Sequence, residues 1–345
     1  AHVWEDGRLY VYASHDIDPP RGCDLMDRYH VFSTDDMVNW TDHGENLNSS
    51  QVPWGRKEGG FMWAPDCVYN KEEQLYYLYF PHMIDEATWR IFVATSREPA
   101  AKFRVKGVIE GIPSTIDPCV FVDDDGQPYI YTSGAGQGCW GGKLRKDDWT
   151  TLDGTMTPLK GFTDFHEAPW MHKYKGKYYC FVTFTNPKII VDTVPNRYNV
   201  QRRATHILTS DKAAGPYHPI SGTDYLPEDW STLDGSFWEE DGVPYMVFCH
   251  EWMQTVNGMI NYIQLAPDLS ESMGTAITLF RASDAPWPRE MKSIGELTFG
   301  MALEGYVADG PFLFRTGTGR LGMLWSSWSN SRCAQGVAYS GSGKL

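Results

Sequence analysis

Basic residues are scarce in this sequence of 345 residues, which has 30 Lys and Arg against 44 Asp and Glu and a formal net charge of −14. Nucleic acids and anionic membrane surfaces attract clustered Lys and Arg, so this balance argues against both as partners. The sequence also has no run of about 18 apolar residues, which excludes a transmembrane helix. It shows neither an initiator Met nor a signal peptide, opens inside a strand-like run and stops at SGSGKL without a finished element. We therefore expect a fragment truncated at both ends and predict no compartment or oligomeric state.

Zinc-binding motifs are also absent. The cysteines number seven, an odd count, and form no CxxC pair or His/Cys cluster. Most lie in apolar strand-like runs, such as Cys180 in YYCFV and Cys249 in MVFCH, so we expect buried free thiols. The three aspartates at 123–125 resemble a calcium loop, but a hairpin turn is the simpler interpretation because the full loop pattern is lacking. We therefore expect no metal site and no required cofactor, with calcium left open as an alternative that no motif supports.

Aromatic residues are abundant: 14 Trp, 19 Tyr and 16 Phe make up 14% of the chain. Together with 33 Gly and the acidic charge, they indicate β-structure and a ligand that stacks on flat rings. A carbohydrate is therefore the expected partner.

Two sequence patterns recur in a fixed order. A turn containing Gly or a charge cluster precedes an aromatic-rich strand, as in DDDGQPYIYTSG (123–134) and EEDGVPYMVFCHE (239–251). A second pattern, such as KDDWTTLDG (146–154), then indicates a third strand, a turn and an outer fourth strand. Hydrophobic periodicity stays near two, without a long amphipathic helix. This order favours a β-propeller of four-stranded blades over a β-sandwich, with six blade-like motifs and, since no linker divides the chain, a single all-β domain over residues 1–345.

Acidic residues precede the hairpins of several of these motifs. In a propeller the first strand of each blade lines the central channel, so these positions should face a ligand. Five carboxylates occupy similar places: Asp66, Asp117, Glu167, Asp234 and Asp309. A carboxylate facing an aromatic-lined channel is costly unless it is hydrogen-bonded or used. Several carboxylates on one axis suggest the acid and base that glycosidic bond hydrolysis requires.

Three motifs in order, WAPD (63–66), IDPCVFVDDDG (116–126) and HEAPWMHKYKGKYY (166–179), resemble glycoside hydrolase family 43. The opening HVWEDGRLYVYASHD (2–16) with STDDMVNW (33–40) is similar to its xylosidase/arabinofuranosidase branch. The resemblance implies a five-bladed propeller that forms a catalytic domain. It also implies an inverting exo-glycosidase that hydrolyses terminal α-L-arabinofuranosyl or β-D-xylosyl linkages of plant polysaccharides or oligosaccharides.

The same resemblance implies roles for particular residues. Glu167 in the EAP motif matches the general acid, and Asp117 in the IDP motif matches the carboxylate that orients the acid and tunes its pKa. A negative charge near Glu167 would raise its pKa and keep it protonated near neutral pH. The family's general base would stand just before Ala1, so we expect this chain to lack it, and a non-catalytic carbohydrate-binding propeller is the alternative function. The residues expected to bind substrate are Trp63, Asp66, His166 and Trp4.

The C-terminal half resembles a different branch of the same family. In that alternative register Asp234 takes the tuning position, and Asp309 falls at or near the acid position, where a Glu is usual. The Gly-His segment that often accompanies a calcium ion in the family is absent. The chain is therefore either a true variant or a join of two related sequences near residues 165–180. A fructosidase or sialidase would share the fold, but their signature motifs are missing.

Simpler structural roles are expected for other polar residues. Arg202 and Arg203 are predicted to be a solvated pair, because Arg head groups mostly stay in water, although either could reach a substrate hydroxyl. His250 and Glu251 follow a strand and lack the second His of a zinc-binding helix, so they are expected to be structural. Trp63 suits a sugar platform and a core aromatic equally well.

Overall fold

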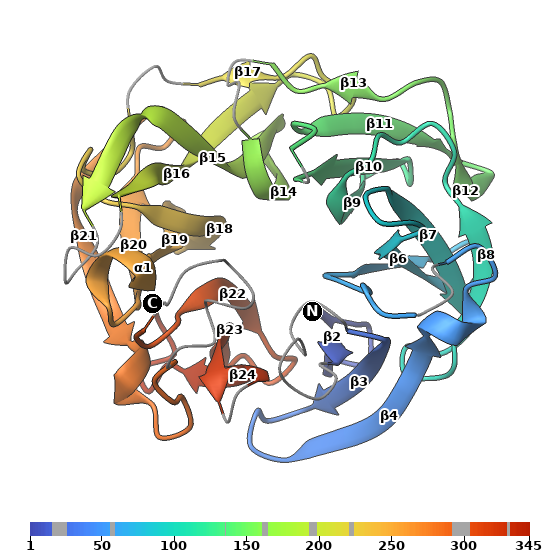
Figure 1. The fold of residues 1–345 in the computed structure, drawn as a ribbon, viewed down its shortest axis with the longest axis horizontal. Helices are drawn as coiled ribbons and strands as arrows, with labels where there is room; N and C mark the ends of the chain where they lie inside the picture. Colours follow the sequence, from blue (N-terminus) through green and yellow to red (C-terminus); the bar gives the residue numbers. More distant parts are fainter. Residues whose placement is uncertain are drawn as a thin grey trace.

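The computed structural model describes residues 1–15, 26–55, 59–134, 136–160, 165–192, 199–220, 224–291, 304–329 and 332–345. In these ranges the chain forms six antiparallel sheets arranged in a ring around a common axis, a six-bladed β-propeller (Figure 1). Within the same ranges, helical structure is limited to α1 (Trp252–Thr255) and the short 3-10 helices Ser49–Gln51 and Ala282–Asp284. Within the described ranges, no helix has the length and apolar character needed to span a membrane.

Each blade is built from one continuous stretch of chain. Blade one contains β1 (His2–Val3), β2 (Leu9–His15), β3 (Arg28–Thr34) and β4 (Trp40–Asn48), and blade two contains β5 (Asp66–Asn70), β6 (Leu75–Met83), β7 (Trp89–Ser96) and β8 (Arg104–Val108). Blade three contains β9 (Ile116–Val122), β10 (Pro128–Ser133), β11 (Trp140–Arg145), β12 (Asp148–Leu152) and the short β13 (Thr157–Pro158), which pairs with β11. Blade four contains β14 (Phe165–Tyr174), β15 (Lys177–Asp192), β16 (Asn199–Ser210) and β17 (His218–Pro219). Blade five contains β18 (Thr232–Glu240), β19 (Val243–His250), β20 (Met259–Leu265) and β21 (Ser272–Arg281), and blade six contains β22 (Asp309–Arg315), β23 (Leu321–Ser329) and β24 (Arg332–Tyr339).

The predicted Asp-Gly turns join inner strands to second strands. Gly7, Gly126 and Gly242 have φ values of +78°, +79° and +78°, a left-handed conformation that glycine adopts without steric cost. Because such turns match the twist of the flanking strands, they close the hairpins at the start of blades one, three and five. The aromatic strands and their turns therefore lie where the recurring patterns place them.

The hydrophobic core lies between neighbouring blades. Tyr29 and Phe80 pack edge-to-face between blades one and two, with ring centroids 5.8 Å apart. Buried Tyr79 of blade two donates a hydrogen bond to the carbonyl of Trp149 in blade three at 2.7 Å. The abundant aromatics thus cover the faces between sheets, as large rings with a polar end do in interiors. Among the described cysteines, Cys67, Cys139, Cys180 and Cys249 are buried free thiols, Cys119 is half-buried and Cys333 is exposed.

The six sequence motifs correspond to six sheets, so the five blades implied by the family resemblance are wrong for this chain. Blade six has three strands in its described part rather than the expected four. Among the residues that the structure describes, blades six and one form separate sheets where the ring closes. At this closing seam, Gly317 N–H donates to the carbonyl of Gly7 at 3.0 Å, and Arg320 Nη1 donates to the carbonyl of Asp36 at 2.8 Å.

The prediction that Arg202 and Arg203 are solvated is also wrong. Arg202 is 0% exposed, and its guanidinium donates to Asp224 Oδ2 at 2.7 Å and to the carbonyls of Trp230 and Pro227 at 2.9 and 3.0 Å. The loop before β18 turns these acceptors inward, and one buried guanidinium with five N–H donors satisfies them together. Burial of Arg202 therefore anchors the segment that leads into the inner strand of blade five.

Candidate active site

Four inner strands contain the same irregularity near their first residues. The strands are β9, β14, β18 and β22. In each, two successive paired residues are three positions apart on the inner strand, whereas their partners on the second strand are two positions apart, which defines a β-bulge. These inner-strand bulges comprise residues 116–119, 167–170, 233–236 and 309–312. They lie on four consecutive blades, three to six, where the inner strands surround the axis (Figure 1).

The local sequence favours these bulges at two positions. The second residue of each has a positive φ; these residues are Asp117 (49°), Ala168 (58°), Asp234 (53°) and Gly310 (59°). The third residue is proline in three of the four bulges, namely Pro118, Pro169 and Pro311, and glycine in the other, Gly235. Proline cannot donate to a ladder and is tolerated inside a sheet only at an edge or a bulge. The positive φ of a residue with a side chain costs free energy, so its repeated use is typical of a functional site.

The bulges place carboxylates at two alternating positions. Asp117 and Asp234 are the second residues of their bulges, in blades three and five, whereas Glu167 and Asp309 are the first residues, in blades four and six. We call Asp117 and Glu167 the first carboxylate pair, and Asp234 and Asp309 the second. Four of the five carboxylates expected near the axis therefore stand on equivalent backbone.

The first carboxylate pair is held together by the backbone of the bulge in blade four. The N–H of Ala168, the residue after Glu167, donates to Asp117 Oδ2 at 3.1 Å. Burial, followed by the charges of Glu167 and Asp234, raises the pKa of Asp117 to about 8. Burial and like charge thus favour a bound proton in the first carboxylate pair near neutral pH, the state from which a carboxyl group can act as a general acid.

The second carboxylate pair repeats this arrangement. The N–H of Gly310, the residue after Asp309, donates to Asp234 Oδ2 at 3.0 Å, and the Asp234 N–H donates to Thr183 Oγ1 at 3.2 Å. Burial raises the pKa of Asp309 well above its usual range, and the charges of Asp234, Glu251 and Glu167 add to the effect, while Arg203 opposes it. The second carboxylate pair thus also favours a bound proton.

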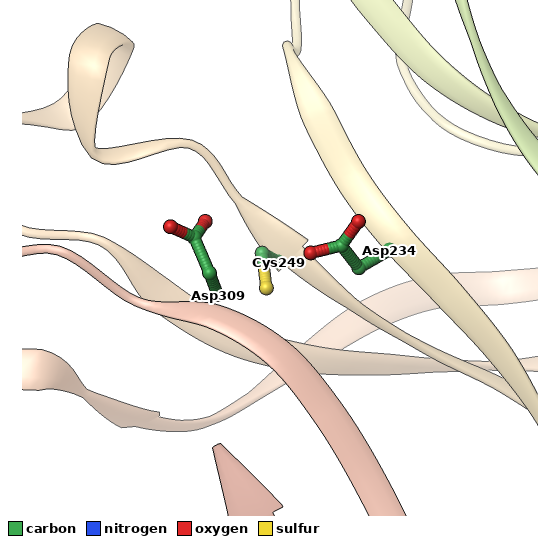
Figure 2. Close-up of side chains that lie close together, drawn as sticks. All are labelled: Asp234, Cys249 and Asp309. Carbon is green, nitrogen blue, oxygen red and sulfur yellow. The ribbon is translucent and has the colours of Figure 1, made fainter. Parts of the chain in front are cut away.

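Cys249 of β19 lies beside the second carboxylate pair (Figure 2). One ligand atom from each of Asp234, Cys249 and Asp309 lies within 4.8 Å of the others, a donor set that zinc accepts. Zinc requires the thiolate, however, and burial raises the pKa of Cys249, with Asp309 and Asp234 adding to the shift. Without a cation, burial and the neighbouring carboxylates thus favour the protonated thiol, and the expected absence of a metal site stays a prediction.

Asp66, the fifth carboxylate, connects three blades. Its Oδ1 is 3.0 Å from His2 Nε2 and accepts from the N–H of Cys67 at 2.9 Å, while its Oδ2 accepts from the N–H of Val120 at 2.7 Å. Both oxygens are thus hydrogen-bonded within the protein. These contacts give Asp66 a structural function, and its predicted role in substrate binding stays a prediction.

The other predicted binding residues lie on blades one, two and four. Trp4 stacks on His2 with ring centroids 4.8 Å apart and donates from Nε1 to Tyr12 Oη at 3.2 Å. Half-buried Trp63 packs on Trp89 with ring centroids 4.6 Å apart, which leaves part of its ring exposed. The side chain of His166 lies outside the described part of the chain. For these residues, too, substrate binding stays a prediction.

Sequence analysis missed two contacts near the carboxylates. Glu251 is 1% exposed and accepts from Arg203 Nη1 at 2.8 Å and from the Ser231 hydroxyl. Trp170 of blade four meets Phe312 of blade six, with ring centroids 4.9 Å apart, although these blades are not neighbours in the ring. Both contacts join residues 48 or more positions apart, so no local pattern could reveal them. The repeated X-Pro steps beside the acidic residues were a signal for the bulges.

Comparison with known proteins adds a direct finding to this geometry. The family model for glycosyl hydrolases family 43 matches the chain twice, over residues 2–185 and over residues 148–340. The chain belongs to glycosyl hydrolase family 43. The match over 2–185 contains the first carboxylate pair, and the match over 148–340 contains the second. The resemblance of both halves to one family is thus confirmed.

Relatives in this family are xylosidases and arabinofuranosidases. The chain is 33% identical to a xylosidase/arabinosidase 43A from Humicola insolens, over 64% of this chain and 76% of that protein. Among solved structures, an α-L-arabinofuranosidase from Clostridium thermocellum is 27% identical, with a TM-score of 0.55 over 80% of this chain and 92% of that one. A β-xylosidase/α-arabinofuranosidase from a compost metagenome, in complex with xylotriose, is 26% identical, with a TM-score of 0.53 over 77% of this chain and 89% of that one. This family 43 propeller is accordingly a glycoside hydrolase.

Proposed function

We propose that this family 43 enzyme releases terminal α-L-arabinofuranosyl or β-D-xylosyl residues from plant polysaccharides or oligosaccharides with inversion at the anomeric carbon. The observation that carries the proposal is the first carboxylate pair, in which Asp117 accepts a hydrogen bond from the N–H that follows Glu167 on the adjacent inner strand. Burial and the charge of Glu167 raise the pKa of Asp117 to about 8. The names of the relatives, xylosidases and arabinofuranosidases, support this choice of sugars.

Glu167 acts as the general acid in this proposal. The bond between the anomeric carbon and the leaving oxygen breaks, and Glu167 delivers a proton to that oxygen while a water molecule attacks the opposite face of the sugar. Asp117 is the positioning residue: its hydrogen bond from Ala168 N–H holds it beside Glu167, and its charge state is coupled to that of the acid. The carboxylate base that takes the proton of the water is expected just before Ala1.

The test measures hydrolysis of 4-nitrophenyl α-L-arabinofuranoside and 4-nitrophenyl β-D-xyloside. The chain itself and a version with Asp added before Ala1 are compared, each with and without Glu167→Gln. We expect Glu167→Gln to lower kcat by about 10²–10⁴-fold, the usual contribution of a positioned proton donor. Glu86→Gln, an exposed position in the turn between β6 and β7, is the matched control and should leave turnover unchanged.

Wild-type turnover in the Glu167→Gln variant would contradict the assignment of the acid. The alternative is a propeller that binds carbohydrate without cleaving it. It would be favoured if neither the chain itself nor the version with the added Asp hydrolysed either glycoside, and if xylotriose still bound to the Glu167→Gln variant. Activity only after addition of the Asp would support the expected position of the base.

A further inference from the structure

The second carboxylate pair has the geometry of the first, two blades further around the ring. In each pair an aspartate at the second position of one bulge accepts a hydrogen bond from the second N–H of the next bulge, at 3.1 Å for Asp117 and 3.0 Å for Asp234. The residue just before that N–H is the other carboxylate, Glu167 or Asp309. Asp309 therefore occupies the same position relative to Asp234 that Glu167 occupies relative to Asp117.

Asp309 also has the surroundings of a proton donor. Its Oδ1 is buried and has no hydrogen-bond partner. An unpaired buried carboxylate oxygen is costly, whereas a protonated carboxyl group is far less so and can donate to a substrate oxygen. The charged groups that act on Asp309 are Asp234, Glu251, Glu167 and Arg203, and three of these four are negative. The one cation, Arg203, is bound to Glu251 at 2.8 Å.

We propose that Asp309 is a second proton donor at the axis of this enzyme, positioned by Asp234, for glycosidic bonds whose leaving oxygen lies toward blades five and six. The inference rests on the proposed glycosidase function. Because an aspartate is one methylene shorter than a glutamate, Asp309 reaches only a leaving oxygen seated close to β22. The two donors therefore serve substrates placed differently at the axis, and the enzyme has two acid sites in one ring.

The reaction at Asp309 balances in the same way as at Glu167. The oxygen of a water molecule forms a bond to the anomeric carbon, and the bond from that carbon to the leaving oxygen breaks with its electron pair on the oxygen. Asp309 gives its proton to the leaving oxygen, and the carboxylate base of the proposed function takes a proton from the water. Solvent then returns the proton from the base to Asp309.

The decisive variants are Asp309→Asn, Glu167→Gln and the double variant, each in the form of the enzyme that shows turnover. Substrates are xylobiose and an arabinofuranosyl-xylobiose, which have poor leaving groups, and the 2,4-dinitrophenyl glycosides of the same sugars, whose leaving groups need little protonation. For one of the two sugars, we expect Asp309→Asn to lower kcat about tenfold or more on the oligosaccharide. The dinitrophenyl glycoside of that sugar should be nearly unaffected, and activity that remains in Glu167→Gln should disappear in the double variant.

The dependence on the leaving group separates proton donation from a structural role, because a distorted site would slow both kinds of substrate alike. Asp309→Glu keeps a donor and should preserve the wild-type ratio of the two rates, which also tests the proposal if Asp309→Asn folds poorly by circular dichroism. Equal losses on both leaving groups, or wild-type rates in Asp309→Asn, would overturn the proposal. If the parent enzyme is active and its activity depends on Glu167 alone, the proposed function stands while this inference fails. If the parent enzyme hydrolyses none of the glycosides, both the proposed function and this inference are contradicted.

Discussion

Carboxylates buried close together determine the chemistry of this propeller at the scale of single residues. Each aspartate at the second position of a bulge is matched by one N–H from the next blade, at 3.1 Å for Asp117 and 3.0 Å for Asp234. Burial and the neighbouring carboxylates raise the pKa of Asp117 in the first pair and of Asp309 in the second, so each pair favours a bound proton. The free-energy cost of burying a second negative charge is the physical reason that these positions can supply a general acid near neutral pH.

Asp117→Asn is expected to stabilise the folded protein at alkaline pH. The folded-state pKa of Asp117 is about 8, above the value of about 3.9 in unfolded chains. A raised folded-state pKa contributes stability that is complete below the unfolded value and is lost as the pH rises through the folded one. Asn does not titrate, so the free energy of unfolding of the variant should gain on the wild type by about 2–4 kcal/mol between pH 5 and pH 8.

Urea unfolding at the two pH values measures this gain. A difference between the two proteins that does not change with pH would contradict the assigned titration. Activity should fall in the same variant, because Glu167 would lose the group that positions it.

The residues that sequence analysis could predict are those whose chemistry is local. The acidic residues of blades three to six precede their hairpins in similar contexts, and the structure brings them to one axis. The environment of each residue was not predictable, because it depends on distant parts of the chain. Glu251 is an example: its partner, Arg203, was expected in solvent but instead binds Glu251 beside the second carboxylate pair.

At the scale of elements, the bulges are the feature that positions the site. The strands themselves followed from alternating aromatic residues and Asp-Gly turns, and their observed bounds agree with that pattern. The bulges were not predicted, although Pro118, Pro169 and Pro311 mark three of them in the sequence. A proline within an inner strand is compatible with the sheet only where the ladder is interrupted, so this signal was present and physical.

Gly235→Ala is expected to destabilise the protein and displace Asp234. A Cβ atom at Gly235 would lie 2.5 Å from Thr205 Cγ2 and 2.6 Å from Thr205 Oγ1, and the Gly235 N–H donates to the same hydroxyl at 2.9 Å. We expect a loss of about 1–3 kcal/mol in the free energy of unfolding, the usual cost of overpacking. Chemical denaturation measures it, with Gly341→Ala as the matched control because a Cβ there meets nothing within 4 Å.

Equal stability of the Gly235 and Gly341 variants would show that β16 and β18 can separate without cost. In that case the bulge of blade five would owe its geometry to contacts other than Thr205.

At the scale of the whole molecule, the sequence predicted the number of blades better than the family resemblance did. The six repeated motifs correspond to six sheets, because the strands and turns of each blade lie within one continuous stretch of sequence. How the ring closes was not predictable, since the seam joins residues at opposite ends of the sequence. The contacts that close it include backbone groups of Gly7 and Gly317, the side chain of Arg320 on the carbonyl of Asp36, and a hydrophobic cluster that joins Leu9 to Phe314.

Gly317→Ala should weaken this closing seam. A Cβ atom at Gly317 would lie 2.9 Å from Gly7 Cα and 3.0 Å from Gly7 O, so blades six and one would have to move apart. We expect the Tm to fall by about 1–2 °C, which corresponds to about 1 kcal/mol in a protein of 345 residues. Calorimetry of Gly317→Ala beside Gly341→Ala measures the effect, and identical transitions would mean that the close approach of Gly317 to Gly7 contributes nothing to stability.

The way the ring closes also bears on how such proteins change over evolutionary time. Since none of the described strands crosses from one sheet to another at the seam, a duplicated or exchanged pair of blades can be inserted into the ring without re-pairing these strands. Each pair of blades, three with four and five with six, brings its own carboxylate pair to the axis. A recombination event that adds two blades to the ring would therefore also add a carboxylate pair at the axis.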